Sequence, residues 1–179
     1  MNKIKILTLS AFCFSAFAAD HLPPLPAWSG ASTQLQKEAQ YPWVTPAEIS
    51  GLTKTPSYDE TFKFLDRLVA SSPLVTMDMI GVSPQGRSIY LVKAGTDPEQ
   101  IGKDGKPVLL VQAGIHSGEI DGKDAGLMLL RDIVKGDKAS LLNDVNLLFI
   151  PVLSVDAHER SGKYNRMNQR GPELQGWRS

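Results

Sequence analysis

Residues 108–119, with the sequence VLLVQAGIHSGE, decide the fold predicted for this chain. The first four residues form a continuous apolar run, which is typical of a β-strand covered on both faces. A helix is predicted to follow from about Gly118 to Lys135. His116 and Glu119 therefore fall where a strand's carboxyl end meets a helix, which is where open α/β sheets place their sites.

His116 and Glu119 are three residues apart, a spacing that puts both side chains on one side of a helix start. An imidazole nitrogen and a carboxylate oxygen are both zinc ligands, with bonds of about 2.0–2.2 Å. The same pair also fits a histidine that only caps or hydrogen-bonds near a helix start. We treat the pair as a candidate metal dyad.

The predicted helix carries a stripe of glycines, Gly118, Gly122 and Gly126, at every fourth position. Each glycine inside a helix costs roughly 1 kcal/mol relative to alanine. We expect another backbone to pass close to this bare face.

The segments around this stretch predict the remaining elements. Ser57 and Glu60 have the spacing of a capping box and start a helix. Residues 75–80 and 89–94 are predicted to be the two strands of an antiparallel hairpin. Residues 145–153 form another apolar strand. Helix, hairpin, strand, helix and strand together predict an α/β fold, a mixed β-sheet flanked by helices on its faces.

Three runs of the sequence occur in order along the chain: IGVSPQGRSI at 80–89, HSGE at 116–119 and IPVLSVDAHE at 150–159. Together they resemble the zinc carboxypeptidase family (the M14 metallopeptidases), with its hairpin turn, its first metal motif and the strand and loop that follow. The family usually has Asn-Pro-Asp-Gly where this chain has Ser-Val-Asp-Ala at 154–157. The resemblance covers roughly residues 57–179.

The resemblance implies a zinc-carboxypeptidase-like fold and one catalytic Zn²⁺, held by two histidine nitrogens and one carboxylate with an open water position. His116 and Glu119 correspond to the first histidine and the carboxylate. Arg178 is the candidate for the catalytic arginine that steadies the oxyanion. Arg166 and Arg170 compete with it for that role.

The other residues of the family's active site are expected beyond Ser179: the second histidine, the general-base glutamate and the residues that bind the substrate's carboxylate. The chain is therefore predicted to be an N-terminal portion of the domain, truncated and inactive on its own. His158 lies near the end of a predicted strand, and we interpret it as a surface loop histidine and not as a ligand.

The predicted function is that of a zinc-dependent metallocarboxypeptidase, which hydrolyses C-terminal peptide bonds in peptide or protein substrates with a free C-terminus. A related zinc amidase or deacylase on the same scaffold stays open as an alternative. So does a non-catalytic binding remnant.

The N-terminal 56 residues are predicted to precede this domain. Residues 1–19 combine early lysines, a short apolar run and the sequence AFAA, which is typical of a secretory signal peptide and predicts a secreted or periplasmic protein. The proline-rich residues 20–56 are predicted to form an extension without helices, pinned to the domain by aromatic side chains. These aromatic residues are Trp28, Tyr41 and Trp43.

Charge and cysteine content limit the partners. The chain has 19 basic and 19 acidic residues without a basic patch, so nucleic acid is excluded as a partner. The apolar run in residues 1–19 is shorter than the roughly 20 residues that a membrane span needs. The single cysteine, Cys13, lies in the predicted signal peptide, so the mature chain has no disulfide.

Overall fold

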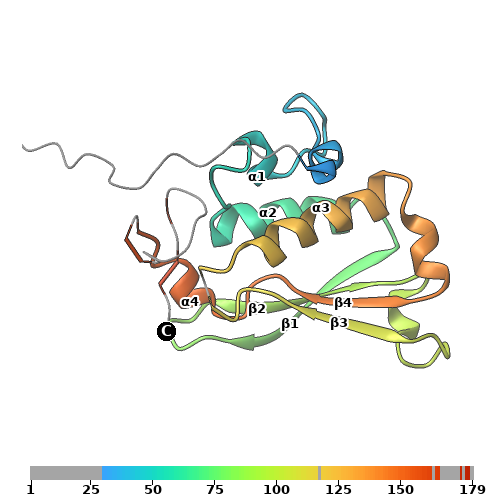
Figure 1. Ribbon diagram of the computed structural model, residues 1–179. Coiled ribbons are helices and arrows are strands. Elements are labelled where there is room, and N and C mark those ends of the chain that lie inside the picture. The colour runs from blue at the N-terminus through green and yellow to red at the C-terminus, as the bar shows by residue number, and fades with distance from the viewer. Residues whose placement is uncertain (1–29, 117, 163, 166–173, 175, 178–179) are drawn as a thin grey trace, which may run out of the picture.

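The described part of the chain forms a mixed four-stranded sheet with two long helices on one face (Figure 1). This computed structural model describes residues 30–116, 118–162, 164–165, 174 and 176–177. The strand order is β1-β2-β4-β3. β1 pairs with β2 and β2 with β4 in antiparallel fashion, while β3 and β4 are parallel. The strands are β1 (Val75–Val82), β2 (Ser88–Ala94), β3 (Val108–Gln112) and β4 (Asn146–Ile150).

The helices confirm the predicted α/β class. α2 (Tyr58–Val69) begins with the predicted capping box, in which Ser57 accepts from the Glu60 amide and the Glu60 carboxylate accepts from the Ser57 amide. No helix among the described residues is long and apolar enough to cross a membrane. The other α-helices are α1 (Pro46–Ile49), α3 (Asp121–Lys135) and α4 (Val155–His158), and short 3-10 helices occupy Ala31–Leu35, Pro98–Gln100 and Ala139–Asn143.

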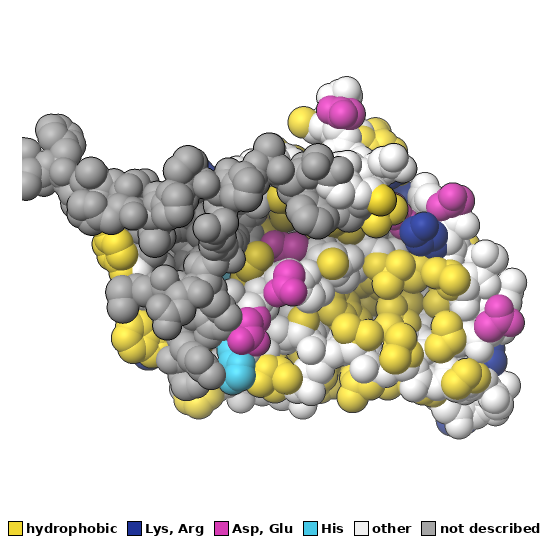
Figure 2. All heavy atoms as spheres, in the orientation of Figure 1, with side chains coloured by type: hydrophobic (Ala, Val, Ile, Leu, Met, Phe, Trp, Pro, Cys, Tyr) yellow, Lys and Arg dark blue, Asp and Glu magenta, His cyan; other side chains and the backbone are white. Residues whose placement is uncertain are grey.

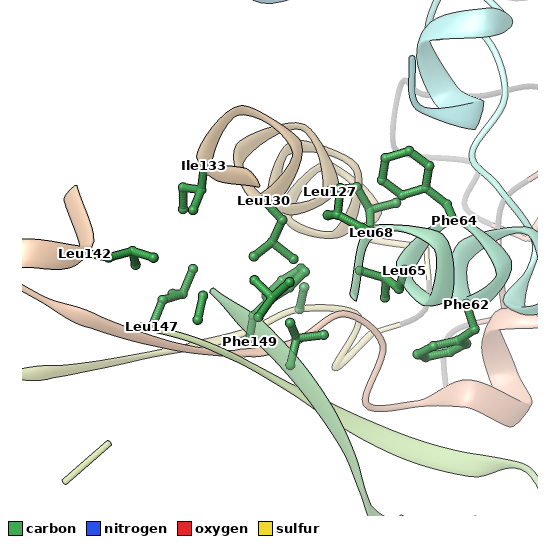
Figure 3. Packing of buried hydrophobic residues seen from close by; sticks show 14 residues of the cluster. Phe62, Phe64, Leu65, Leu68, Leu127, Leu130, Ile133, Leu142, Leu147 and Phe149 are labelled. Carbon is green, nitrogen blue, oxygen red and sulfur yellow. The ribbon is translucent and has the colours of Figure 1, made fainter. Parts of the chain in front are cut away.

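The core lies between the sheet and the two long helices (Figure 3). Leu65 of α2, Leu127 and Leu130 of α3 and Phe149 of β4 are at most 1% exposed. Burial of each such side chain contributes roughly 1.5–3 kcal/mol before the entropy of ordering is counted. This packing fixes α3 above β4, and so places the start of α3 beside the carboxyl end of the parallel strand pair.

The glycines of α3 lie against side chains of the core and not against another backbone. A Cβ on Gly126 would overlap the ring of Phe149, whose Cε2 atom lies only 2.7 Å from that position. At Gly122 the nearest atom is the Ala113 Cβ, at 3.3 Å. The prediction of a close backbone is therefore wrong at these two positions, because a buried aromatic side chain fills the space at Gly126.

β3 is an edge strand, and the prediction that both of its faces are covered is wrong for the described residues. Leu109 is 53% exposed and Leu110 is 57% exposed. The register with β4 places Leu109 beside Leu147 on the side that faces the helices, so Leu110 lies on the opposite side. An apolar run can predict a strand, but whether the strand is covered depends on which elements lie beside it.

The N-terminal extension is folded onto the helices between residues 30 and 56. Trp43 packs against the core, with Arg67 Cζ 5.0 Å and Lys135 Nζ 4.5 Å from its ring centroid. This confirms the predicted pinning by Trp43, whereas Trp28 lies outside the described residues. The prediction that prolines prevent any helix is wrong at Pro46, which begins α1, where the missing N–H costs nothing.

Candidate metal centre

The dyad lies in the turn between β3 and α3, at the carboxyl end of the strand. α3 begins at Asp121, three residues later than predicted, and the Glu119 amide donates to the His116 carbonyl over 2.8 Å. The chain leaves β3 through Gly114, whose φ of +59° suits glycine. The two side chains are thus brought together by a turn and not by the first turn of the helix.

The donor atoms of the two side chains converge. His116 Nδ1 lies 3.3 Å from Glu119 Oε1 and 3.2 Å from Oε2. Two donors on one tetrahedral zinc ion, each bonded at about 2.0–2.1 Å, lie about 3.3–3.4 Å apart. The side chains are 40% and 45% exposed, so an ion can reach them from solvent. Donor type, spacing and access therefore all fit two ligands of a zinc ion.

The dyad alone does not complete a metal site. A catalytic zinc is held by three protein ligands. Among the described residues, no group of three or more His, Cys, Asp or Glu side chains is arranged to hold a metal ion. The three candidate arginines, Arg166, Arg170 and Arg178, all lie outside the described residues.

His158 is a buried helix residue, so the prediction of a surface loop histidine is wrong. It is 5% exposed, because α4 turns it inward together with Val155 and Ala157. Its Nδ1 lies 2.9 Å from Glu159 Oε1. A carboxylate only accepts hydrogen bonds, so Nδ1 carries the proton and donates. Nε2 is buried and has no hydrogen-bond partner among the described residues.

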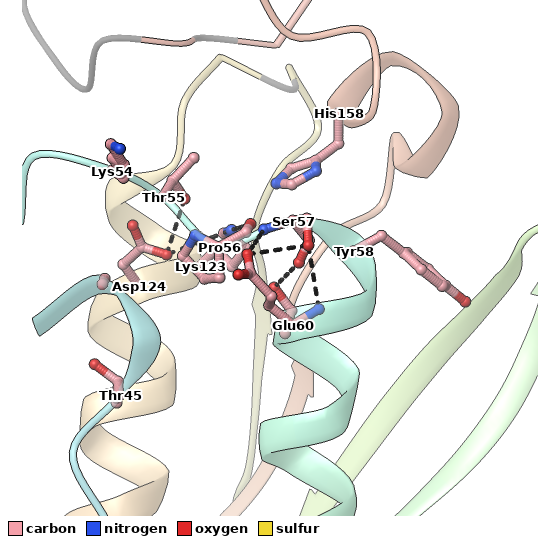
Figure 4. A network of polar contacts seen from close by, with 12 residues as sticks. Thr45, Lys54, Thr55, Pro56, Ser57, Tyr58, Glu60, Lys123, Asp124 and His158 are labelled. Carbon is pink, nitrogen blue, oxygen red and sulfur yellow. Dashed lines mark hydrogen bonds and ion pairs between the residues drawn. The ribbon is translucent and has the colours of Figure 1, made fainter. Parts of the chain in front are cut away.

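His158 lies near the buried charged side chains of Lys123 and Asp124, close to the N-terminal ends of α2 and α3 (Figure 4). Burial, and then the charge of Lys123, lower the pKa of His158, which favours the neutral ring. Burial also lowers the pKa of Lys123 to about 8, although Asp124 opposes that shift. Lys123 donates to the Pro56 carbonyl, which ties the extension to α3. A cavity of about 220 Å³ beside His158 is lined by neither member of the dyad.

Helix α4 is tied to the β1–β2 turn by Asp156. Its carboxylate accepts from Ser83 Oγ at 2.8 Å, from the Gln85 amide at 3.0 Å and from Arg87 at 2.8 Å. Burial raises the pKa of Asp156, but the hydrogen bonds from Arg87, Ser83 and Gln85 outweigh it and hold the pKa below its usual range. One residue further, the Ala157 carbonyl accepts from the Trp177 amide at 3.1 Å.

The sequence did not predict this contact between the β1–β2 turn and α4. The two runs at 80–89 and 150–159 were both singled out in the sequence, but nothing in either run indicates that it meets the other. The only indication in the sequence is the presence of a serine and an arginine in the turn, because both side chains can donate hydrogen bonds to an aspartate.

The profile of the zinc carboxypeptidase family matches residues 61–176. That is more than half of the chain, and the chain therefore belongs to this family, whose members are peptide hydrolases. No protein with a curated description matches it.

Solved carboxypeptidase structures share the fold. Carboxypeptidase A from Helicoverpa armigera is 24% identical, with a TM-score of 0.54, and the match covers 71% of this chain and 29% of that chain. Bovine thrombin-activatable fibrinolysis inhibitor, in complex with tick carboxypeptidase inhibitor, is 20% identical, with a TM-score of 0.53 and coverages of 65% and 37%. A metallo-carboxypeptidase from Burkholderia cenocepacia is 20% identical, with a TM-score of 0.50 and coverages of 66% and 35%. The chain thus spans about a third of the length of these proteins.

Proposed function

We propose that this chain supplies the first two metal ligands, His116 and Glu119, of a zinc-dependent metallocarboxypeptidase that hydrolyses C-terminal peptide bonds. The observation that carries the proposal is the convergence of His116 Nδ1 and both Glu119 oxygens within 3.3 Å at the carboxyl end of β3. The substrates are peptides or proteins with a free C-terminus. Residues 1–19 act as a signal peptide, so the protein works outside the cytoplasm.

Zinc, when bound, lowers the pKa of a coordinated water and polarises the scissile carbonyl. His116 and Glu119 hold the ion, and their exposure leaves a side open to substrate. The Asp156 contacts hold α4 against the β1–β2 turn, and the Trp177 amide donates to the Ala157 carbonyl at the same helix. Arg178 is proposed to stabilise the developing oxyanion.

Two ligands hold zinc weakly, so we expect the chain on its own to bind zinc with low affinity and to leave a blocked dipeptide intact. Competition with a chromogenic chelator measures the affinity of the chain and of His116→Ala and Glu119→Ala. His158→Ala serves as the control, because it removes a histidine that lies outside the dyad. We expect both dyad variants to lose the binding and the control to retain it. Equal binding by the chain and both dyad variants would contradict the proposal.

A further inference from the structure

The turn that carries His116 and Glu119 is held at both of its ends. At the β3 end, the Ser154 amide donates to the Gly114 carbonyl over 2.9 Å, which fixes the chain where it leaves the sheet. At the other end the turn runs into the first turn of α3, so the place of Glu119 depends on how the start of this helix is held. Figure 2 shows acidic side chains and a histidine exposed around the start of α3. The contacts that hold this start come from buried side chains of the same helix.

Two buried charged residues in the first turn of α3 hold it against the segment that precedes α2 (Figure 4). Lys123 is 1% exposed, and its ammonium donates to the Pro56 carbonyl. Asp124 is 8% exposed and accepts from Thr55 Oγ1 over 3.1 Å. The Asp124 amide donates over 2.9 Å to the carbonyl of Ile120, the residue that follows the dyad. The two buried side chains therefore act one residue away from the dyad.

The segment that receives these contacts also holds α2 and α4. Ser57 caps α2 together with Glu60. The Tyr58 amide donates over 2.8 Å to Glu159 Oε1, in the residue that follows α4. Residues 55–58 thus bond to all three helices that meet at this end of the molecule, and the start of α3 is fixed relative to the other two.

The ion pair between Lys123 and Asp124 is unfavourable for the fold. Burial lowers the pKa of Lys123 to about 8 and raises the pKa of Asp124, so burial disfavours both charged forms, although the side chains lie 3.5 Å apart. Replacing a buried ion pair by apolar residues often leaves a fold equally stable or makes it more stable. A contribution to overall stability therefore does not explain why these two residues are charged.

We propose that Lys123 and Asp124 are positioning residues, which fix the place of Glu119 by bonding the first turn of α3 to Pro56 and Thr55. Neither residue is a metal ligand, and both act through the backbone of the helix start. The part of this inference that concerns zinc affinity rests on the proposed function, whereas the part that concerns the turn does not.

Amide hydrogen exchange of the metal-free chain tests the hold on the turn. The reporter is the Glu119 amide, which donates to the His116 carbonyl over 2.8 Å. Thr55→Val removes one donor without changing the shape of the side chain, 69 residues away from Asp124 in the sequence. We expect exchange at Glu119 to become at least about threefold faster, because a single hydrogen bond is lost. Thr55→Ser keeps the hydroxyl and should restore the original rate.

Lys123→Met tests the second bond, because it removes the donor to Pro56 and keeps an unbranched side chain. We expect exchange at Glu119 to become at least about fivefold faster and the zinc affinity of the chain to fall by a similar factor. Lys135→Met is the matched control. It removes a bond from the other end of the same helix, to the Ser71 carbonyl over 3.1 Å, and should change neither value.

The outcomes separate this proposal from a loss of overall stability and from the proposed function. Unchanged exchange at Glu119 in both Thr55→Val and Lys123→Met overturns the proposal. So does an equal change in Lys135→Met, or an equal increase at the Leu65 amide in the core of α2, which would report unfolding of the whole domain. If the unchanged chain binds no zinc, the proposed function fails, and faster exchange at Glu119 alone still supports the anchoring of the turn.

Discussion

Glu48→Ala should destabilise the fold strongly, because Glu48 and Arg131 form an ion pair whose side chains are both 0% exposed. Removing one partner of a buried pair costs about 3–5 kcal/mol. Asp132 stays 2.8 Å from Arg131 Nε and offsets part of the unpaired charge, so we expect about 3 kcal/mol. The substitution also removes the acceptor of the Lys37 amide and of the Thr45 amide and hydroxyl, each at 2.8 Å.

Urea unfolding at pH 7, followed by circular dichroism, measures this change. Glu99→Ala is the control, because Glu99 is 70% exposed in its pair with Lys93, and such pairs are worth about 0–1 kcal/mol. Replacing Glu48 and Arg131 together by methionine should cost less than Glu48→Ala, because no charge is then left buried. A loss below about 1 kcal/mol for Glu48→Ala would refute the reasoning.

The dependence of the free energy of unfolding on pH, measured in acid, also tests the ion pair of Glu48 and Arg131. Burial raises the pKa of Glu48, but hydrogen bonds from Arg131, Thr45 and Lys37 outweigh it and hold the pKa below its usual 4.5. The folded chain therefore keeps this carboxylate ionised when the unfolded chain has protonated it. The difference in the free energy of unfolding between the unchanged chain and Glu48→Ala should have its largest value above pH 4.5 and become smaller as the pH falls below 4.5. A difference that grows with acid would contradict the assignment.

Three further changes have defined outcomes. Gly126→Ala should lower stability by about 1–3 kcal/mol in urea unfolding, because the new methyl meets a buried ring, while Gly122→Ala should cost less. The pKa of Lys123 is lowered to about 8 in the folded chain and is 10.5 in the unfolded chain. Between these two pH values the unfolded chain binds one proton more than the folded chain, so the free energy of unfolding should rise by about 3 kcal/mol from pH 8 to pH 10.5. Lys123→Met should abolish this rise. Asp156→Asn should speed amide hydrogen exchange in the β1–β2 turn without changing exchange in α2, and unchanged exchange in the turn would contradict the role of this carboxylate.

Local chemistry made much of the fold predictable. The Ser57 and Glu60 pair satisfies the backbone of its own helix start, so its spacing is a sufficient signal. Apolar and polar residues alternate along the strands at 75–80 and 89–94 according to which face of the sheet is buried, so the two strands could be predicted locally. The turn between them then predicts the hairpin. The closeness of His116 and Glu119 was also predictable, because three residues cannot separate two side chains far in a turn.

The features that the sequence did not indicate depend on partners distant along the chain. Glu48 and Arg131 are 83 residues apart, and neither has a neighbour that suggests a buried pair. Gly126 is explained only by the ring of Phe149, and the burial of His158 only by the way α4 docks. For β3, the composition predicted a covered strand, but covering is a property of neighbouring elements.

The most direct test of the central claim is a zinc titration of the ¹⁵N-histidine-labelled chain, followed by NMR of the ring nitrogens. The account predicts that the Nδ1 resonance of His116 shifts towards a metal-bound value, that His158 stays unchanged, and that Glu119→Ala removes the shift. A His116 resonance that does not respond to saturating zinc in the folded chain would contradict the claim that this turn is a metal centre.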